Sequence, residues 1–318
     1  MLVEYAVGNP ADDSTVVTLL TTTDASGYSP SVLVTAVDAA TGNAVQPTPW
    51  NITSAGALSG CNNTAASGAS GLAVSSDGGV ALVSASFGAY TACLVALEVA
   101  TGAVLWSAPV VQAPPWTPLA DPGDASRAYV FSGSATVSAL RLADGSVLWT
   151  ATLPRNESAI VGVAVVSGSL FVAASFAVNG CPLSLTRVYA INVASGQIGA
   201  SASIRHYPDV GAGGAIVAAA DAAGGAMVYV RGTNTRTAAE GLDSFIVVLA
   251  FNGSAFHETF ASRGSATGTG VAGVAAACRR SDVGYVPLGT LAVGPRDGQV
   301  LVADAVGIQL FGQQPVGG

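Results

Sequence analysis

The chain has 318 residues, of which 50% are hydrophobic and only 9% are charged, with 39 glycines and a formal net charge of −8. The acidic balance argues against a nucleic-acid partner, because phosphate binding depends on clustered Lys and Arg. All 11 basic residues are Arg, which excludes a Schiff-base lysine and a P-loop lysine.

One short pattern recurs along the chain: an alternating apolar run, a small polar residue and a glycine, followed by a second apolar run. The alternation predicts a β-strand. The polar residue can bond its own backbone and glycine accepts a positive φ, so the pair is expected to close a hairpin. The copies span residues 34–42, 94–102, 137–145, 188–196 and, more faintly, 246–253.

Two tryptophans follow this pattern at a fixed distance. Trp106 and Trp149 stand four residues after their glycines, on the returning strands. The matching positions in the other copies hold Gln46, Ala200 and His257, so two copies are expected to carry the tryptophan.

Two further strands are expected before each hairpin. Four strands in a unit of about 40 to 50 residues predict a propeller blade. The expected fold class is all-β, a β-propeller of about six four-stranded blades. We expect a single domain over residues 1–318, with blades near 2–50, 51–110, 111–154, 155–204, 205–260 and 261–318.

The closure of the ring is left open by the sequence. The sixth unit is visible only in part, at residues 291–293, 299–303 and 308–311, and it lacks the turn motif. Residues 2–7 are either the innermost strand of blade one or the strand that completes blade six. No segment resembles a secretory signal, so we expect that a signal has been removed or that the chain is a segment of a longer protein.

Residues 159–178 form a stretch without charge that is long enough to span a membrane. Ser167, Gly168 and Ser169 interrupt it where the repeat requires two strands. The stretch therefore predicts a strand-turn-strand hairpin, and no membrane-spanning segment is expected.

The run from strand through Asp-x-x-Thr-Gly to Trp resembles the pyrroloquinoline-quinone-like (PQQ-like) β-propeller repeat. Its best copies are residues 37–42 and 97–106, and the resemblance covers about 15–256. Quinone enzymes of this family are similar to larger eight-bladed propellers with an adjacent cysteine pair, calcium and a catalytic Asp. This chain has no adjacent cysteines, so the resemblance implies the fold and argues against the cofactor, and no cofactor is expected.

The four cysteines are Cys61, Cys93, Cys181 and Cys278, and none forms a C-x-x-C pair, which disfavours a zinc site. On the blade map, Cys61 and Cys93 fall in loops on one face of the ring, so a Cys61–Cys93 disulfide is favoured. Cys181 and Cys278 would pair by elimination. The alternative is four buried free thiols.

Four N-x-S/T sequons place candidate N-glycosylation sites at Asn51, Asn62, Asn156 and Asn252. Three lie in expected inter-blade loops and Asn252 lies in a hairpin turn, and exposed loops are where glycans can be accepted. Together with the cysteines, they suggest a secreted or cell-surface glycoprotein.

The sequence indicates no catalytic set, so no catalytic or metal-binding residue is assigned. His206 lies in the polar and aromatic run Arg205, His206 and Tyr207, which is either a loop site or a hydrogen-bonded inter-blade loop. His257 occupies the tryptophan position and is expected to be structural. No G-x-S-x-G accompanies either histidine.

Other polar clusters have a simple structural explanation beside the functional one. Acidic residues at 12–13, 77, 121, 124 and 282 can ligate calcium. The preferred explanation for these residues is that they form turns. Arg279 and Arg280 suit an acidic partner or a solvated loop. Trp116 is either an exposed platform for a glycan or peptide, or a side chain packed between blades.

The leading hypothesis is a non-catalytic extracellular propeller glycoprotein that acts as a structural or interaction module in a larger assembly. Its expected partners are other extracellular proteins or glycans. One alternative is a propeller enzyme that depends on a quinone or acts on polysaccharides. The other is a bacterial envelope assembly scaffold, as the resemblance allows.

Overall fold

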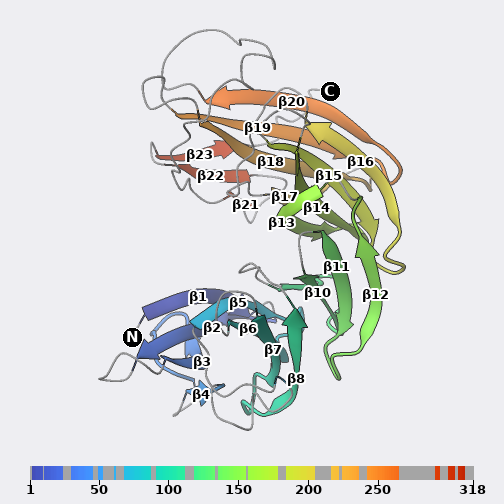
Figure 1. The fold of residues 1–318 in the computed structure, drawn as a ribbon. Helices are drawn as coiled ribbons and strands as arrows, with labels where there is room; N and C mark the ends of the chain where they lie inside the picture. Colours follow the sequence, from blue (N-terminus) through green and yellow to red (C-terminus); the bar gives the residue numbers. More distant parts are fainter. Residues whose placement is uncertain are drawn as a thin grey trace. The chain divides into compact units, whose positions relative to one another are not determined.

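In the computed structural model, described strands form five four-stranded sheets and one three-stranded sheet, in each of which consecutive strands pair (Figure 1). No α-helix occurs among the described residues, which confirms the all-β expectation, while a blade count of six is not established. The structure describes residues 2–9, 11–23, 30–45, 49–52, 61, 68–86, 91–111, 118–132, 135–154, 157–177, 184–204, 216–221, 224–235, 242–264, 291–293, 300–304 and 307–311.

The chain divides into two compact units, and the first, Met1–Thr152, contains three sheets. Sheet one has β1 (Leu2–Asn9), β2 (Asp12–Thr23), β3 (Pro30–Asp38) and β4 (Trp50–Asn51). Sheet two has β5 (Gly68–Val74), β6 (Val80–Ser86), β7 (Thr91–Glu98) and β8 (Val104–Val111). Sheet three has β9 (Leu119–Ala120), β10 (Arg127–Ser132), β11 (Thr136–Arg141) and β12 (Val147–Thr152).

The second unit, Leu153–Gly318, contains the other three sheets. Sheet four has β13 (Glu157–Val166), β14 (Ser169–Ala177), β15 (Ser184–Asn192) and β16 (Ile198–Ile204). Sheet five has β17 (Ile216–Ala220), β18 (Ala226–Thr235), β19 (Leu242–Phe251) and β20 (Phe256–Gly264). Sheet six has β21 (Leu291–Val293), β22 (Val300–Asp304) and β23 (Gly307–Phe311).

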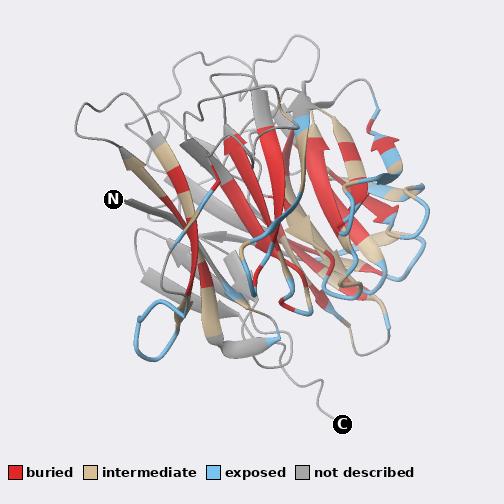
Figure 2. Cartoon of the chain, turned by 90° about the horizontal axis from the view of Figure 1, so that it is seen from below, coloured by how far each residue is buried: buried red, intermediate tan, exposed pale blue. Residues whose placement is uncertain are grey.

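Sheet two shows how the first unit builds its core. Cys93, Val95 and Leu97 of β7 pack in the cluster shared with sheet one, whereas Leu94 and Ala96 belong to the cluster shared with sheet three. A strand that is buried on both faces needs a continuous apolar run, as β7 has. Figure 2 shows the same pattern more widely, with buried residues along the strands and exposed residues at the turns.

The first strands of consecutive sheets contact one another within each unit. β5 contacts β1 and β9 in the first unit, and β17 contacts β13 and β21 in the second. Successive four-stranded meanders that meet through their first strands are the arrangement of propeller blades. Within each unit the first strands thus face one another, and the fourth strand of each four-stranded sheet forms the opposite edge.

Two questions that the sequence raised are answered by the strand pairing. The described part of the uncharged stretch, residues 159–177, forms the expected hairpin, in which β13 and β14 pair antiparallel around Ser167 and Gly168. β1 pairs with β2 as the first strand of sheet one, so it is not the strand that completes sheet six. Within the described ranges, a search for a helix long and apolar enough to cross a membrane finds no candidate.

Candidate functional site

In sheets one and four, the repeated turn is organised by the polar residue that stands four positions before the glycine. In sheet one, Asp38 Oδ1 accepts hydrogen bonds from the amides of Ala40 (3.1 Å) and Thr41 (2.7 Å) and from the Thr41 hydroxyl (2.8 Å). Asn192 caps the turn of sheet four in the same way. Gly42 has a φ of +68°, as the turn requires. These exposed polar groups therefore already serve the hairpin.

A β-bulge follows the turn in sheets two, three and four. In sheet two, Trp106 pairs with Ala96 and Val104 pairs with Leu97, so Leu105 has no partner in the ladder. The same irregularity recurs in sheets three and four. Bulges change the direction of the side chains that follow them, and here the next side chain in sheet two is Trp106.

Trp106 joins sheet two to the turn of sheet three. Its indole Nε1 donates a 2.6 Å hydrogen bond to the carbonyl of Leu142. A Cβ added at Gly145, in the same turn, would lie 2.9 Å from Trp106 Cδ2. The repeated segment thus forms a hairpin within its own sheet and also a contact, called here the joint, with the turn of the next sheet.

The first sheet also carries a tryptophan at this joint, which corrects the expectation of two. Gln46 lies outside the described residues, and Trp50, four residues later, pairs with Val34. Its ring lies directly over Gly102, where an added Cβ would overlap it. The sequence alignment missed Trp50 because the connection after the turn is longer in this copy.

In the second unit, the positions that correspond to Trp106 hold no tryptophan. Ala200 and His257 pair with Ala190 and Ala250, which confirms that they occupy the register position of Trp106. Nothing lies within 4 Å of a Cβ added at Gly253. The core here instead contains an aromatic cluster, in which the Phe251 ring centroid lies 5.3 Å from Phe171 and 4.9 Å from Phe256.

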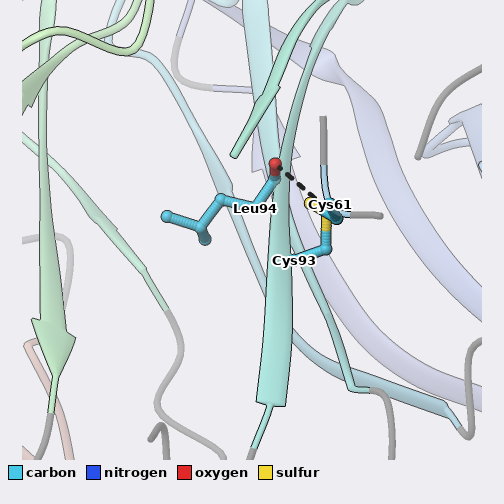
Figure 3. Close-up of a disulfide and its surroundings, with 3 residues drawn as sticks. All are labelled: Cys61, Cys93 and Leu94. Carbon is cyan, nitrogen blue, oxygen red and sulfur yellow. Dashed lines mark hydrogen bonds between the residues drawn. A yellow bond between two sulfur atoms is a disulfide. The ribbon is translucent and has the colours of Figure 1, made fainter. Parts of the chain in front are cut away.

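A disulfide fastens the connection between sheets one and two to the core (Figure 3). Cys61 is bonded to Cys93, with 5.9 Å between their Cα atoms, which confirms the favoured pairing. Cys93 is fully buried in the cluster shared with sheet one, and Cys61 packs against the same cluster. Cys93 Sγ lies 3.7 Å from the Leu94 carbonyl oxygen, a packing contact because a disulfide sulfur has no proton to donate.

A buried charged cluster occupies the turn between β9 and β10. The Tyr129 hydroxyl donates a 2.6 Å hydrogen bond to Asp121 Oδ2, which lies 3.6 Å from Arg127 Nη1. Arg127 Nη2 lies 2.8 Å from Asp124 Oδ2. Burial and the bond to Asp121 raise the pKa of Tyr129, so its phenol stays protonated and donates. These residues satisfy one another, and the expected turn role of Asp121 and Asp124 is confirmed.

Sheet four contains a smaller polar group that the sequence did not single out. Arg187 Nε donates to the Ser203 hydroxyl at 3.1 Å, and Arg187 Nη1 donates to the Tyr189 hydroxyl at 3.2 Å. The signal in the sequence was a single charged residue inside an apolar strand, which is weak evidence for any role. The bond to Ser203 links β15 to β16, and the bond to Tyr189 lies within β15.

Most of the residues that the sequence marked as candidate disulfide, glycosylation or interaction sites lie outside the described residues. These are Cys181, Cys278, Asn62, Asn156, Trp116, Arg205, His206, Tyr207, Arg279 and Arg280. Asn51 lies exposed on β4, and Asn252 lies exposed in the turn between β19 and β20. His257 is exposed on β20.

Asp77 has the role of a turn residue. Asp77 accepts hydrogen bonds from the Ser75 hydroxyl (2.6 Å) and the Gly79 amide (3.0 Å), as a turn residue does. No group of three or more His, Cys, Asp or Glu side chains suited to a metal ion is found in the part of the chain that the structure describes.

Solved structures with the same fold are numerous and distant in sequence. Hydrazine synthase of Kuenenia stuttgartiensis is 14% identical, with a TM-score of 0.59, and the match covers 94% of this chain and 72% of the other. The β-propeller domain of the trilobed protease from Pyrococcus furiosus is 10% identical, with a TM-score of 0.54 over 98% and 84% of the two chains. The dihydro-heme d1 dehydrogenase NirN is 12% identical, with a TM-score of 0.52 over 97% and 60%.

These similarities show a β-propeller fold, and at such low identity they show the fold alone. No curated protein sequence matches the chain. The model of one protein family, described as "Outer membrane protein assembly factor BamB", matches residues 30–244, which is more than half of the chain. Its repeats are of the PQQ-like kind that the turn and tryptophan pattern indicated. The chain therefore belongs to this PQQ-like, BamB-type family of β-propellers.

Proposed function

We propose that this chain is a non-catalytic propeller module that works outside the cytosol, as a structural or protein/glycan interaction part of a larger assembly. The observation that carries the proposal is the Cys61–Cys93 disulfide, whose Cys93 side is fully buried in the core. Disulfides persist in oxidising compartments and are rare where thiols are kept reduced. The disulfide supports a location outside the cytosol, and the location proposed is secreted or at the cell surface.

The hydrogen bonds that the described polar side chains already make support the proposed non-catalytic role. Asp38, Asp77 and Asp124 bond the amides and hydroxyls of their own turns. Asp121 is only 4% exposed and bonds Tyr129. A general acid or base must instead present its proton-transferring atom to a substrate. The same fold is found in enzymes, so these contacts, and not the fold, argue for a scaffold.

The proposed module is a single propeller over residues 1–318, and its partners are other extracellular proteins or glycans. Four sequons support a glycoprotein. The acidic charge and the absence of lysine support neither nucleic-acid binding nor a lysine-bound cofactor. The interaction loops proposed are those that carry Trp116, the run from Arg205 to Tyr207, and Arg279 with Arg280.

A test is to purify the protein from its native source without denaturation and cross-link it through carboxylates, since it offers 19 acidic residues and no lysine. We expect a stable assembly larger than the chain, with cross-links to another protein. A free monomer that binds pyrroloquinoline quinone saturably in the presence of calcium would contradict the proposal. A sample treated with reductant and urea before cross-linking controls for unspecific coupling.

The second candidate function is an assembly scaffold of a bacterial envelope. The observation that favours it is the match of residues 30–244 to a family described as an outer membrane protein assembly factor. The disulfide suits that compartment equally well. N-linked glycans on the native protein would decide for the first candidate.

A further inference from the structure

The turn between β19 and β20 is shorter than those of sheets one and four, because Asn252 stands directly before Gly253, and it carries a glycosylation sequon. Asn252, Gly253 and Ser254 are all exposed. Asn252 takes the capping role that Asp38 has in sheet one and Asn192 has in sheet four. Neither of those turns contains a sequon, because Asp38 is not an asparagine and Ala194 stands two residues after Asn192, where Asn252 has Ser254.

The turn uses one side of the Asn252 amide and leaves the other free. Asn252 Oδ1 accepts hydrogen bonds from the Ser254 amide (3.0 Å), the Ser254 hydroxyl (3.0 Å) and the Ala255 amide (2.9 Å). No bond from Asn252 Nδ2 is found among the described residues. An N-linked sugar attaches to that nitrogen, and the carbonyl oxygen remains an acceptor afterwards. The turn and a glycan therefore do not compete for the same atom.

The neighbouring sheet leaves space around this turn. Trp106 covers the equivalent turn of sheet three, but sheet four carries Ala200 in the tryptophan position. A Cβ added at Gly253 meets no atom within 4 Å. A bulky substituent on Asn252 therefore has no packed ring to displace in the described part of this unit.

We infer that Asn252 is an N-glycosylation site and that its turn accepts the glycan without rearrangement, which rests on the extracellular function proposed above. The donor is an oligosaccharide on a lipid pyrophosphate. A bond forms between Asn252 Nδ2 and the anomeric carbon while the bond from that carbon to the pyrophosphate breaks. The amide nitrogen loses one proton, and nothing is oxidised or reduced.

This glycan stands at the end of the sheet where the tight turns lie. In an up-and-down meander, the connection to the next sheet starts at the opposite end from this turn. Asn51 is on β4, in a ladder pair with Leu33, and Asn62 and Asn156 fall in connections outside the described residues. A glycan on Asn252 would shield the turn end of sheet five.

The experiment expresses the full chain through a eukaryotic secretory pathway and maps its glycopeptides by mass spectrometry before and after amidase release. Asn252→Asp keeps the Oδ1 acceptor, as Asp38 does, but cannot carry the sugar. Ser254→Ala removes the sequon while keeping Asn252, and Ser254→Thr keeps the sequon. Asn192, with the same turn contacts and no sequon, is the internal control.

We expect a glycan on Asn252 in the unchanged chain and in Ser254→Thr, and loss of that one glycan in Asn252→Asp and Ser254→Ala. Amidase release leaves Asp at a glycosylated Asn252, so the informative comparison is with the glycosylated parent, whose melting temperature should match that of Asn252→Asp. Unmodified Asn252 in a chain glycosylated at Asn51, Asn62 or Asn156 overturns this inference and leaves the proposed function standing. Absence of glycan at all four asparagines overturns both.

Discussion

The indole N–H of Trp106 donates a 2.6 Å hydrogen bond to the carbonyl of Leu142, 36 residues further along the chain. This bond crosses from the outer strand of sheet two to the turn of sheet three. The bulge at Leu105 lies directly before Trp106 in the hairpin of sheet two. Because a bulge redirects the side chains that follow it, the hairpin of sheet two determines where Trp106 contacts sheet three.

Trp106→Phe should therefore destabilise the chain through a specific lost hydrogen bond. Phe keeps most of the ring but leaves the carbonyl of the buried Leu142 without its donor, so we expect a loss of about 1 to 2 kcal/mol in unfolding free energy. Urea unfolding followed by circular dichroism measures it. Leu105→Ala, at the exposed bulge, should change stability by less than about 0.5 kcal/mol. Equal losses of unfolding free energy in Trp106→Phe and Leu105→Ala would argue against a stabilising contact between Trp106 and sheet three.

Gly145→Ala should cost more than Gly42→Ala, although both glycines have nearly the same positive φ, +71° and +68°. At Gly42 the cost is the strain of a left-handed residue, about 1 kcal/mol. At Gly145 the added methyl also meets Trp106 at 2.9 Å, which raises the expected loss to about 2 to 3 kcal/mol. In a Trp106→Ala background, the difference between the two variants should disappear in thermal unfolding.

Removal of the disulfide should lower stability strongly. Cys61 and Cys93 are 32 residues apart in sequence. In the chain-entropy model, the double variant Cys61→Ala/Cys93→Ala loses about 3 to 4 kcal/mol. The measurement is urea unfolding with and without reductant. Any sensitivity to reductant that remains in the double variant reports a second disulfide, which is expected between Cys181 and Cys278.

Stability should fall in acid partly through Asp124. The Ser126 hydroxyl, then the Ser126 amide and the Arg127 charge, lower the pKa of this carboxyl. A carboxyl with a lowered pKa in the folded state stabilises the protein above its unfolded pKa, about 3.9, and this contribution is lost as the pH falls through the folded value.

Asp124→Asn keeps an oxygen acceptor but removes the charge. It should lower stability by less than about 1 kcal/mol near neutral pH, because solvent screens the partly exposed side chain. Its melting temperature should decline less steeply than that of the parent as the pH falls below about 4. Parallel curves for the two proteins would show that Asp124 does not contribute.

Local periodicity was enough to predict the hairpins and the all-β fold, because alternation and turn chemistry act between near neighbours. The comparison of the repeat copies missed Trp50, because a longer connection places it outside the usual spacing after the glycine. Trp50 nevertheless packs over Gly102 as Trp106 packs over Gly145. The pairing of Asp121 with Tyr129 was not foreseen, because it depends on how β9 meets β10.

The central claim is a disulfide-bonded, glycosylated module that acts by binding. The most direct test is the intact mass of the protein from its native source, measured before and after denaturation and reduction. The account predicts hexose-type mass heterogeneity, Cys61 and Cys93 oxidised before reduction, and no small molecule released on denaturation. Free thiols at Cys61 and Cys93, or a discrete released cofactor, would contradict it.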